Sequence, residues 1–520
     1  MGKVRNILFI MCDQLRADHL GCYGHPYMET RNLDALAQRG VRFANAFVQS
    51  GVCGPSRMSM YTGRYVSSHG ATWNRVPLSI GEITLGEYLH DAGRALSLVG
   101  KTHVMTDHAA MQRLGVGSET ELGALLAAGG FVEADRHDGH HAEPDSRYAE
   151  YLRGKGYAGR DPWTDFVISA VGAAGKLASG WNMRNARLPA RVAEADSETA
   201  YTTDRAMEFI RAKGDEPWAL HLSYVKPHWP YMAPAPYHHR YALDQCLPVR
   251  RAPRELDSSH PVLAAYRAQE ECANFMRDEV WQAVRPTYQG LVQQVDDHLG
   301  RVWETLEMLG RFDDTLIVFT ADHGDFLGDH WLGEKEHFYD TVQRVPLIVY
   351  DPDRAADTTR GAVETRFAEG VDLVPTFLAA LDLPAMRERV EGVSLLALTR
   401  ADATPAWRDQ VVSELDYAYR EARRSLGRAP DECRAWMVRT ERWKYVHWQG
   451  FRPQLFDLVR DPSELVDLGA DPGLESVRQA CAKRLLDKLG TLRHRITLDD
   501  AEIAARTDTH RARGIHIGIF

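Results

Sequence analysis

The chain has 520 residues, of which 44% are hydrophobic and 26% are charged, a balance typical of globular proteins rather than disordered ones. Its net charge of −10 argues against a general nucleic-acid binder, because such proteins present a basic face to the phosphate backbone. No run approaches the ~18 uninterrupted apolar residues of a membrane span. We therefore expect no nucleic-acid and no membrane partner, and enough chain for one large domain and a smaller one.

The cysteines number seven and are scattered, so they suggest neither a disulfide framework nor a thiolate zinc site. The first apolar run, Ile7 to Cys12, is too short for the core of a signal peptide and is interpreted as a buried strand. A cytoplasmic enzyme is the interpretation that these observations favour.

Short apolar runs alternate with longer helical ones, which predicts an α/β fold with a mostly parallel sheet flanked by helices. The helix expected over Tyr288 to Leu309 carries an apolar stripe at three- and four-residue spacing, which is typical of a core helix. The sequence predicts strands at Ile7–Met11, Leu96–Gly100, Trp218–Tyr224, Thr315–Thr320 and Pro346–Tyr350.

Changes in the pattern of predicted strands and helices along the sequence predict a catalytic domain over 1–385, a smaller α+β domain over 386–496 and a tail over 497–520. An irregular insertion over 110–197 is where substrate-specific loops are expected, and its His-rich patch at 136–141 is interpreted as a solvated loop rather than a metal site. The apolar end of the tail leads us to expect a homo-oligomer. The small domain is predicted to hold a short antiparallel sheet, Trp436–Thr440, Lys444–Trp448 and Gln454–Asp457, followed by a helix over Gly473–Leu489.

The stretch around Cys53 predicts a reactive side chain at the start of a helix. Pro55 suits the first helical position and Gly63 suits the end, so Cys53 is expected over exposed backbone amides that attract anions. Arg57, one turn along, offers a bidentate contact to a tetrahedral oxyanion. The alternative is a small buried cysteine that only caps a core helix.

Acidic and imidazole side chains follow two of the predicted strands. Asp13 follows the first, and Asp322 and His323 follow Thr315–Thr320. Because ligands collect at the carboxyl ends of strands in an open α/β sheet, these groups are expected at one edge. They form a mixed oxygen and nitrogen set that suits a divalent ion such as Mn²⁺ better than Ca²⁺ or Mg²⁺. Taken alone, an Asp-His-Gly sequence after a strand is as often a turn as a ligand.

Four further basic side chains lie where the loops after the strands converge: Lys101, His103, His228 and Lys335. Individually these are ordinary surface lysines and capping histidines. Around one anion, with Arg57, they would neutralise charge and supply a proton donor for a leaving group. Together with Cys53 they predict an anion hydrolase.

The same residues resemble a known family. Cys53-Gly54-Pro55-Ser56-Arg57, with Thr62-Gly63-Arg64 after it, resembles the sulfatase signature, in which a formylglycine-generating system oxidises the cysteine to Cα-formylglycine. The resemblance implies an alkaline-phosphatase-like α/β fold with a small C-terminal sheet. It spans nearly the whole chain in order, through Asp13, Gly100-Lys101-Thr102-His103, Lys226-Pro227-His228, Asp322-His323-Gly324, Lys335 and the phrase from Arg439 to Tyr445.

Two positions depart from the common calcium sulfatases, which carry two adjacent aspartates after the first strand and Asp-Asn at the later turn. Gln14 and His323 stand there instead, as in the branch that holds phosphonate monoester hydrolases and choline sulfatases. This departure favours Mn²⁺ and keeps Ca²⁺ as the alternative. Ser56 and the pair Lys101 and His103 resemble ordinary sulfatases, so substrate preference stays open.

The resemblance implies a metal-dependent, arylsulfatase-type hydrolase of sulfate monoesters that acts through a covalent hemiacetal on formylglycine at position 53. The alternative within the family is a phosphonate monoester or phosphate diester hydrolase with a side activity on sulfate. The implied roles are metal binding for Asp13, Cys53, Asp322 and His323, oxygen binding for Arg57 and Lys335, proton transfer for Lys101, His103 and His228, and pocket lining for Asn74.

Two other classes of protein fit less well. A two-metal phosphatase or phosphomutase on the same fold would need an unmodified Ser or Thr nucleophile and a second ligand set, and Cys53 with its basic neighbours argues against both. A binding protein with a degenerate site would not retain nearly every expected polar residue.

Overall fold

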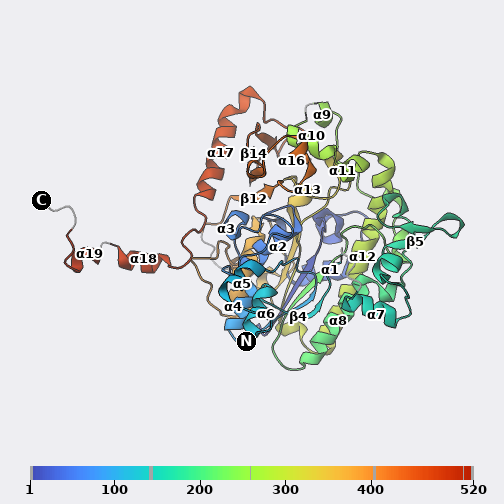
Figure 1. Cartoon of the computed structure of the whole chain (residues 1–520), viewed down its shortest axis with the longest axis horizontal. Helices are drawn as coiled ribbons and strands as arrows, with labels where there is room; N and C mark the ends of the chain where they lie inside the picture. Colours follow the sequence, from blue (N-terminus) through green and yellow to red (C-terminus); the bar gives the residue numbers. More distant parts are fainter. Residues whose placement is uncertain (1–3, 140–144, 258, 402–405, 508, 517–520) are drawn as a thin grey trace.

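The computed structural model describes residues 4–139, 145–257, 259–401, 406–507 and 509–516. Within these residues a central sheet of nine strands forms the core (Figure 1). Its strands are β1 (Asn6–Cys12), β2 (Val41–Phe47), β3 (Leu96–Gly100), β4 (Phe131–Arg136), β7 (Ala219–Tyr224), β8 (Thr315–Ala321), β9 (Arg344–Tyr350), β10 (Val363–Glu364) and β11 (Ala368–Glu369).

The sheet is mostly parallel. Its order is β10-β2-β9-β8-β1-β7-β3-β4, with β11 also paired to β2. Strand β9 runs antiparallel to both β2 and β8, and the other pairs are parallel. Every residue of β1, β7 and β8 is buried, as expected for strands covered on both faces. The predicted α/β class with a mostly parallel sheet is confirmed.

Strands β2 and β4 were not among the expected strands. In β2 a bulge between Phe43 and Ala46 shifts the register, and three of its seven residues are only partly buried. β4 ends the sheet and carries Glu133, Asp135 and Arg136, so it lacks the continuous apolar run of a central strand. β2 pairs with β9, β10 and β11, which are about 300 residues later in the chain, whereas β4 pairs with β3, 35 residues earlier, and local composition reveals neither pairing.

Helices cover both faces of the sheet (Figure 1). One group packs around α12 (Asp278–Met308), which includes the helix expected from Tyr288 but begins ten residues earlier along the chain, at Asp278. This group contains α1 (Arg31–Arg39), α7 (Arg147–Gly154) and α8 (Glu198–Lys213). The other group contains α2 (Cys53–Thr62), α3 (Val66–His69), α4 (Leu85–Asp91), α5 (His108–Leu114), α6 (Glu121–Ala127) and α14 (Leu373–Ala380).

A second, antiparallel sheet lies towards the C-terminus, in the order β12 (Gln410–Asp416), β13 (Arg434–Thr440), β14 (Trp443–Trp448) and β15 (Gln454–Asp457). Helix α17 (Glu475–Leu489) packs on one face through Cys481 and Leu485. The backbone amide of Glu414 in β12 donates to the carbonyl of Gln49 at 2.8 Å, close before α2. The small sheet is therefore bonded directly to the segment that leads to Cys53. The domain boundaries at 385 and 496 stay a prediction.

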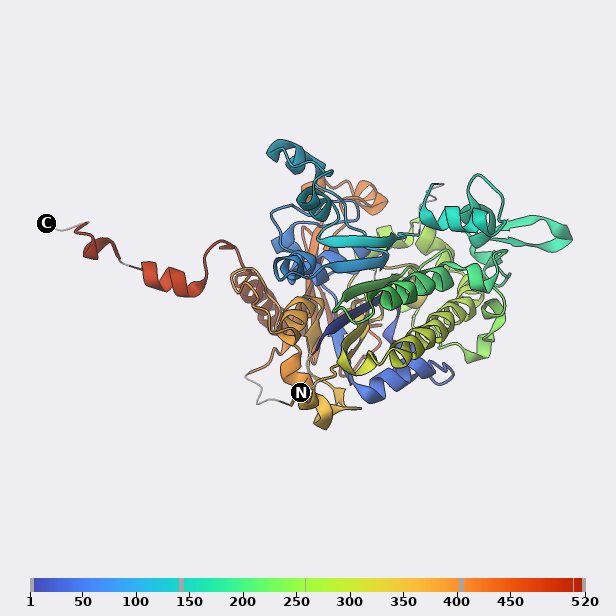
Figure 2. The same ribbon diagram turned by 90° about the horizontal axis from the view of Figure 1, so that it is seen from below.

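Short helices complete the described chain. Four of them, α9 (Arg254–Asp257), α10 (Pro261–Arg267), α11 (Glu270–Phe275) and α16 (Glu421–Ser425), lie near the second sheet (Figure 1). A hairpin of β5 (Ser169–Val171) and β6 (Leu177–Ser179) projects from the body, as does the tail with α18 (Asp500–Arg506) and α19 (Thr509–Ala512) (Figure 2). No helix in the described part of the chain is long and apolar enough to cross a membrane.

The end of β3 has a backbone conformation that requires glycine. Gly100 has φ +102°, and a Cβ there would lie 1.9 Å from the carbonyl oxygen of Ser223 on the neighbouring strand. The amide of the next residue, Lys101, donates to that same carbonyl at 3.1 Å. Gly100 therefore sets the direction in which Lys101 leaves the sheet.

We expect Gly100→Ala to lower the urea midpoint of unfolding strongly, because it adds a backbone clash to the strain of a positive φ. The matched control is Gly93→Ala, which also has a positive φ (+73°) but nothing within 4 Å of the added carbon. The control should cost about 1 kcal/mol of unfolding free energy, and Gly100→Ala about 3 kcal/mol or more. Equal midpoints for the two variants would contradict this account.

Candidate active site

Cys53 is the first residue of α2, and the ten residues of that helix are all buried. The helix ends at Gly63, whose φ of 69° is the left-handed conformation expected at a C-cap. Pro55 is the third helical residue rather than the first. The amide of Gly54 donates to Asn74 Oδ1 at 2.7 Å, so Asn74 covers the N-terminus of α2 beside Cys53.

The chain brings Asp13, Cys53, Asp322 and His323 together. One ligand atom from each lies within 4.8 Å of the others, all four residues are buried, and this is the one such group among the residues that the structure describes. Strand register explains half of it, because Cys12 of β1 pairs with Ala321 of β8 and the next residues are Asp13 and Asp322. These side chains therefore meet at one edge of the sheet.

The donor set fits a divalent metal ion. His323 Nδ1 donates to the carbonyl oxygen of Gly324 at 2.8 Å, which leaves Nε2 as the nitrogen that can bind a metal ion when it is deprotonated. His323 Nε2 lies 3.1 Å from Cys53 Sγ and 3.6 Å from Asp13 Oδ1. Two carboxylates, an imidazole nitrogen and the side chain at position 53 are ligands of the kind that such ions take.

Arg57 lies behind the carboxylates and is completely buried. Its Nε donates to Asp322 Oδ2 at 2.7 Å, and its Nη2 lies 3.5 Å from Asp13 Oδ2. Its Nη1 donates to Ser223 Oγ at 2.9 Å and to the carbonyl oxygen of Lys101 at 3.0 Å. In this arrangement the guanidinium bridges both carboxylates and the end of β3.

Asp13 is also paired with Lys101, whose Nζ contacts Asp13 Oδ2. Burial alone would raise the pKa of Asp13, but the charges of Lys101, His228 and Arg57 outweigh it and hold that pKa well below its usual range. The carboxylate therefore stays ionised inside the protein and available to a cation.

Lys335 places its ammonium group beside the sulfur of Cys53. Its Nζ lies 3.2 Å from Cys53 Sγ, 3.3 Å from Gln14 Oε1 and 2.8 Å from His228 Nε2. Burial would lower the pKa of Lys335, but Cys53 and Asp13 raise it above its usual value, so the ammonium stays charged. The loop that carries it is tightly constrained, because Glu334 and Glu336 on either side both have positive φ angles.

The side chain at position 53 lies in a field that favours negative charge. Burial and Asp13 raise the pKa of the Cys53 thiol, whereas Lys335, His323 and Lys101 lower it, and the net shift is downward. His323 responds in the opposite sense, since Asp322 and Cys53 overcome burial and raise its pKa to about 8. An oxyanion placed at this position would experience the same cations.

His228 contacts Lys335, and His103 lines a cavity. His228 Nδ1 lies 2.7 Å from the carbonyl oxygen of Trp229, so it carries the proton and Nε2 accepts from Lys335. His103 has a φ of 61° and lines a cavity of about 550 Å³, together with residues of the 110–197 insertion such as Arg136 and Trp163.

Three residues that support the cluster were not nominated from the sequence: Gln14, Tyr231 and Asp325. Gln14 Nε2 and the hydroxyl of Tyr231 both donate to Asp325 Oδ2, each at 2.6 Å. The backbone N–H of Gln14 donates to Asp322 Oδ1 at 3.0 Å. The supporting roles of Gln14 and Asp325 could have been predicted from their positions close to Asp13 and Asp322 in the sequence, whereas no sequence motif marks Tyr231.

The His-rich patch of the insertion has ion-pair partners where it is described. Arg136 pairs with Glu133 and Asp138, and His137 Nε2 lies 2.8 Å from Glu198 Oε1. Residues 140 and 141 lie outside the described residues.

Comparison with known proteins gives consistent matches along the chain. The family model described as Sulfatase matches residues 5–383, and the model described as N-sulphoglucosamine sulphohydrolase, C-terminal, matches residues 328–491. The multifunctional alkaline phosphatase superfamily protein PehA of Trinickia caryophylli is 30% identical over 508 residues, covering 93% of this chain and 94% of that protein. The arylsulfatase of Clostridium perfringens is 26% identical over 488 residues, covering 89% of this chain and 90% of that protein.

Among solved structures, the phosphonate monoester hydrolase SpPMH from Silicibacter pomeroyi superposes with a TM-score of 0.84 at 29% identity. The match covers 95% of this chain and 97% of that one. The similarity therefore includes the central sheet, the second sheet and the segments that carry the buried cluster.

Proposed function

The chain belongs to the sulfatase family, and on that premise we propose that it is a metal-dependent hydrolase of sulfate monoesters that uses formylglycine made from Cys53. The observation that carries this proposal is the place of Cys53 at the N-terminus of α2. Its sulfur lies within 3.8 Å of a carboxylate, an imidazole and an ammonium. A structural cysteine in a core helix would not need these partners.

We assign the metal to Asp13, Asp322, His323 and the side chain at position 53. When both are in place, the hydrated formylglycine supplies an in-line nucleophile and a divalent ion supplies the Lewis acidity that activates it. Arg57 and Lys101 hold the two carboxylates in place through the ion pairs described above. This differs from the contact with ester oxygens first expected of Arg57, because its nitrogens already donate to protein oxygens.

Lys335 and His228 are assigned to the transferred group and the leaving oxygen. Lys335 remains protonated and faces position 53, so it suits the oxygens on which negative charge develops. His228 shares a hydrogen bond with Lys335 and is the proton-transfer group nearest to it. A role for His103 as base stays a prediction.

The alcohol portion of the ester is assigned to two cavities beside the cluster. One is the 550 Å³ cavity that His103 lines, and the other has a volume of about 270 Å³ and is lined by Trp181, Trp229 and Glu334. Trp229 follows His228 and Glu334 precedes Lys335, while Trp181 comes from the 110–197 insertion. This supports the expectation that the insertion contributes to substrate choice.

A phosphonate monoester or phosphate diester hydrolase is the second candidate function. The similarity to SpPMH, with a TM-score of 0.84, favours it, as does the presence of Gln14 in place of a second aspartate after β1. Both candidates use the same residues, so the site geometry does not separate them. A formylglycine-generating partner, a homo-oligomer and a cytoplasmic location stay predictions.

We expect Cys53→Ala and Cys53→Ser to reduce turnover by about 10⁴-fold or more, because alanine has no group to oxidise and a serine hydroxyl that stays unoxidised is not the aldehyde. Both should keep the far-ultraviolet circular dichroism of the parent protein. The matched control is Cys272→Ser, a buried cysteine within α11 that is outside the cluster. Intact-protein mass spectrometry of active material should find formylglycine at position 53, and a fully active enzyme with an unmodified thiol there would refute the mechanism.

Chelation should abolish activity, and Mn²⁺ should restore it better than Ca²⁺, because His323 contributes a nitrogen ligand that calcium disfavours. The measurement is the initial rate after dialysis against chelator and titration with each metal. His323→Asn should shift the preference towards Ca²⁺. Equal restoration of the parent enzyme by both ions would contradict the role given to His323.

Rates on 4-nitrophenyl sulfate and on a 4-nitrophenyl phosphonate monoester, measured with one preparation of known formylglycine content, should separate the two candidate functions. The sulfatase proposal predicts the larger kcat/KM on the sulfate. A kcat/KM at least tenfold larger on the phosphonate would establish the second candidate instead, since both leaving groups are the same phenol.

A further inference from the structure

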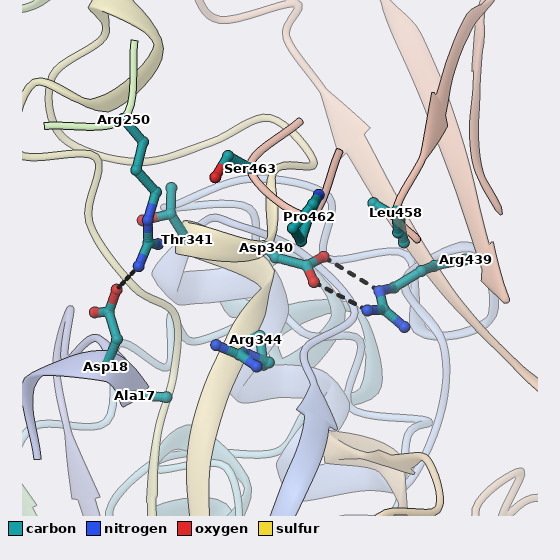
Figure 3. Close-up of a pocket in the computed structure, with 10 residues that line it drawn as sticks. All are labelled: Ala17, Asp18, Arg250, Asp340, Thr341, Arg344, Arg439, Leu458, Pro462 and Ser463. Atoms are coloured by element: carbon teal, nitrogen blue, oxygen red, sulfur yellow. Dashed lines mark hydrogen bonds and ion pairs between the residues drawn. The ribbon is translucent and has the colours of Figure 1, made fainter. Parts of the chain in front are cut away.

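A cavity of about 370 Å³ is lined by residues of the central sheet, of the second sheet and of the segments next to them (Figure 3). It is lined by three arginines from separate segments: Arg250 before α9, Arg344 at the start of β9 and Arg439 in β13. The hydroxyl residues Thr341 and Ser463 also line it. None of the residues that line it belongs to the cluster around Cys53.

The ion pairs on one side of this cavity carry excess positive charge. Asp18 pairs with Arg16 at 2.8 Å and with Arg250 at 3.0 Å. Asp329, which is completely buried, pairs with Arg16 at 2.9 Å and with Arg285 at 2.5 Å. Arg16, Arg250 and Arg285 thus share two aspartates, which leaves one excess positive charge. Of these three arginines, Arg250 is the one that lines the cavity.

The other side of the cavity is balanced except for Arg344. Asp340 pairs with Arg439 at 3.1 Å and with Lys444 at 2.6 Å, and Lys444 also pairs with Glu464 at 2.5 Å. The guanidinium of Arg344, which is half-buried, makes no direct hydrogen bond or ion pair with any described residue, and it shares the charge of Asp340 with Arg439 and Lys444. Figure 3 shows it lying between the Arg250–Asp18 pair and the Asp340–Arg439 pair.

We propose that this cavity is a binding site for a tetrahedral dianion such as inorganic sulfate or phosphate, held by Arg344 with help from Arg250 and Arg439. A guanidinium presents its donors in a fork that matches such oxygens, and an uncompensated charge in a partly buried cavity favours a counter-ion. A liquid water occupies about 30 Å³, so the cavity has room for an oxyanion and several waters. The two excess charges match a dianion better than a monoanion.

The bound anion would join three parts of the fold. Arg344 begins β9 of the central sheet, Arg439 belongs to β13 of the second sheet, and both flank α13 (Asp340–Gln343). Within α13 the carbonyl of Val342 accepts from the amide of Gly324, the residue after His323. The site therefore lies one hydrogen bond away from the turn that carries His323, although its existence does not depend on the proposed activity.

The proposal is tested by locating the bound ion in crystals and by measuring its affinity in solution. Crystals of the full chain soaked in selenate should give an anomalous peak within 4 Å of the Arg344 guanidinium, and Arg344→Gln crystals should lack it. By isothermal titration, sulfate should bind Arg344→Gln at least tenfold more weakly at this site than the parent protein. Arg387→Gln, an exposed arginine elsewhere, is the matched control and should bind like the parent.

Two comparisons decide what is recognised. Perchlorate, tetrahedral but singly charged, should bind at least tenfold more weakly than sulfate at equal ionic strength, and Arg344→Lys should bind between the parent and Arg344→Gln. Thermal unfolding of each variant checks that it is folded. Any one of three results would overturn the proposal. They are superimposable sulfate titrations for the parent and Arg344→Gln, equal binding of sulfate and perchlorate, and a selenate peak without measurable binding in solution.

Discussion

Two buried carboxylates at the ends of adjacent parallel strands are the constraint on which the rest of the site depends. Asp13 and Asp322 follow paired positions of β1 and β8, so the sheet itself forces two like charges together. In a low-dielectric interior such a pair stays ionised only when cations compensate it. Arg57 and Lys101 provide that compensation from α2 and from the end of β3, and both are completely buried. A bound metal ion would add to the same balance.

This balance explains why distant segments meet at one place. Arg57 must arrive on a helix, which places Cys53 one turn earlier at the helix start, beside the carboxylates. Lys101 must leave β3 at the right angle, which requires the positive φ of Gly100. Lys335 arrives on a loop with unfavourable left-handed residues on either side of it, a strain that the surrounding contacts must overcome. The second sheet supports the segment before α2 through Gln49.

The sequence carries much of this arrangement, but not all of it. Central strands and the residues that follow them could be predicted, because apolar runs and the strand-end rule depend on local pattern. The partners of Arg57 could not be predicted, since the sequence around an arginine four residues after a cysteine is the same whether the arginine contacts a substrate or a carboxylate. The hydrogen bond between Gln14 and Asp325 joins residues 311 positions apart, and the Tyr231 hydroxyl adds to it without any motif. Strand β12 could not be predicted from its own residues, because it forms by pairing with β13, which lies further along the chain.

The complete burial of Cys53 has a consequence for the order of events in the life of the chain. Its side chain is inaccessible, it belongs to a helix with no exposed residue, and Asn74 covers the adjacent amide. If Cys53 is the formylglycine precursor that we propose, a separate protein that oxidises it could not reach it once α2 is packed. The conversion would then have to precede folding, and the fraction of active molecules would depend on how fast modification is relative to folding. Slower folding would then yield more active protein, and a chain refolded without the modifying system would be native in shape yet inactive.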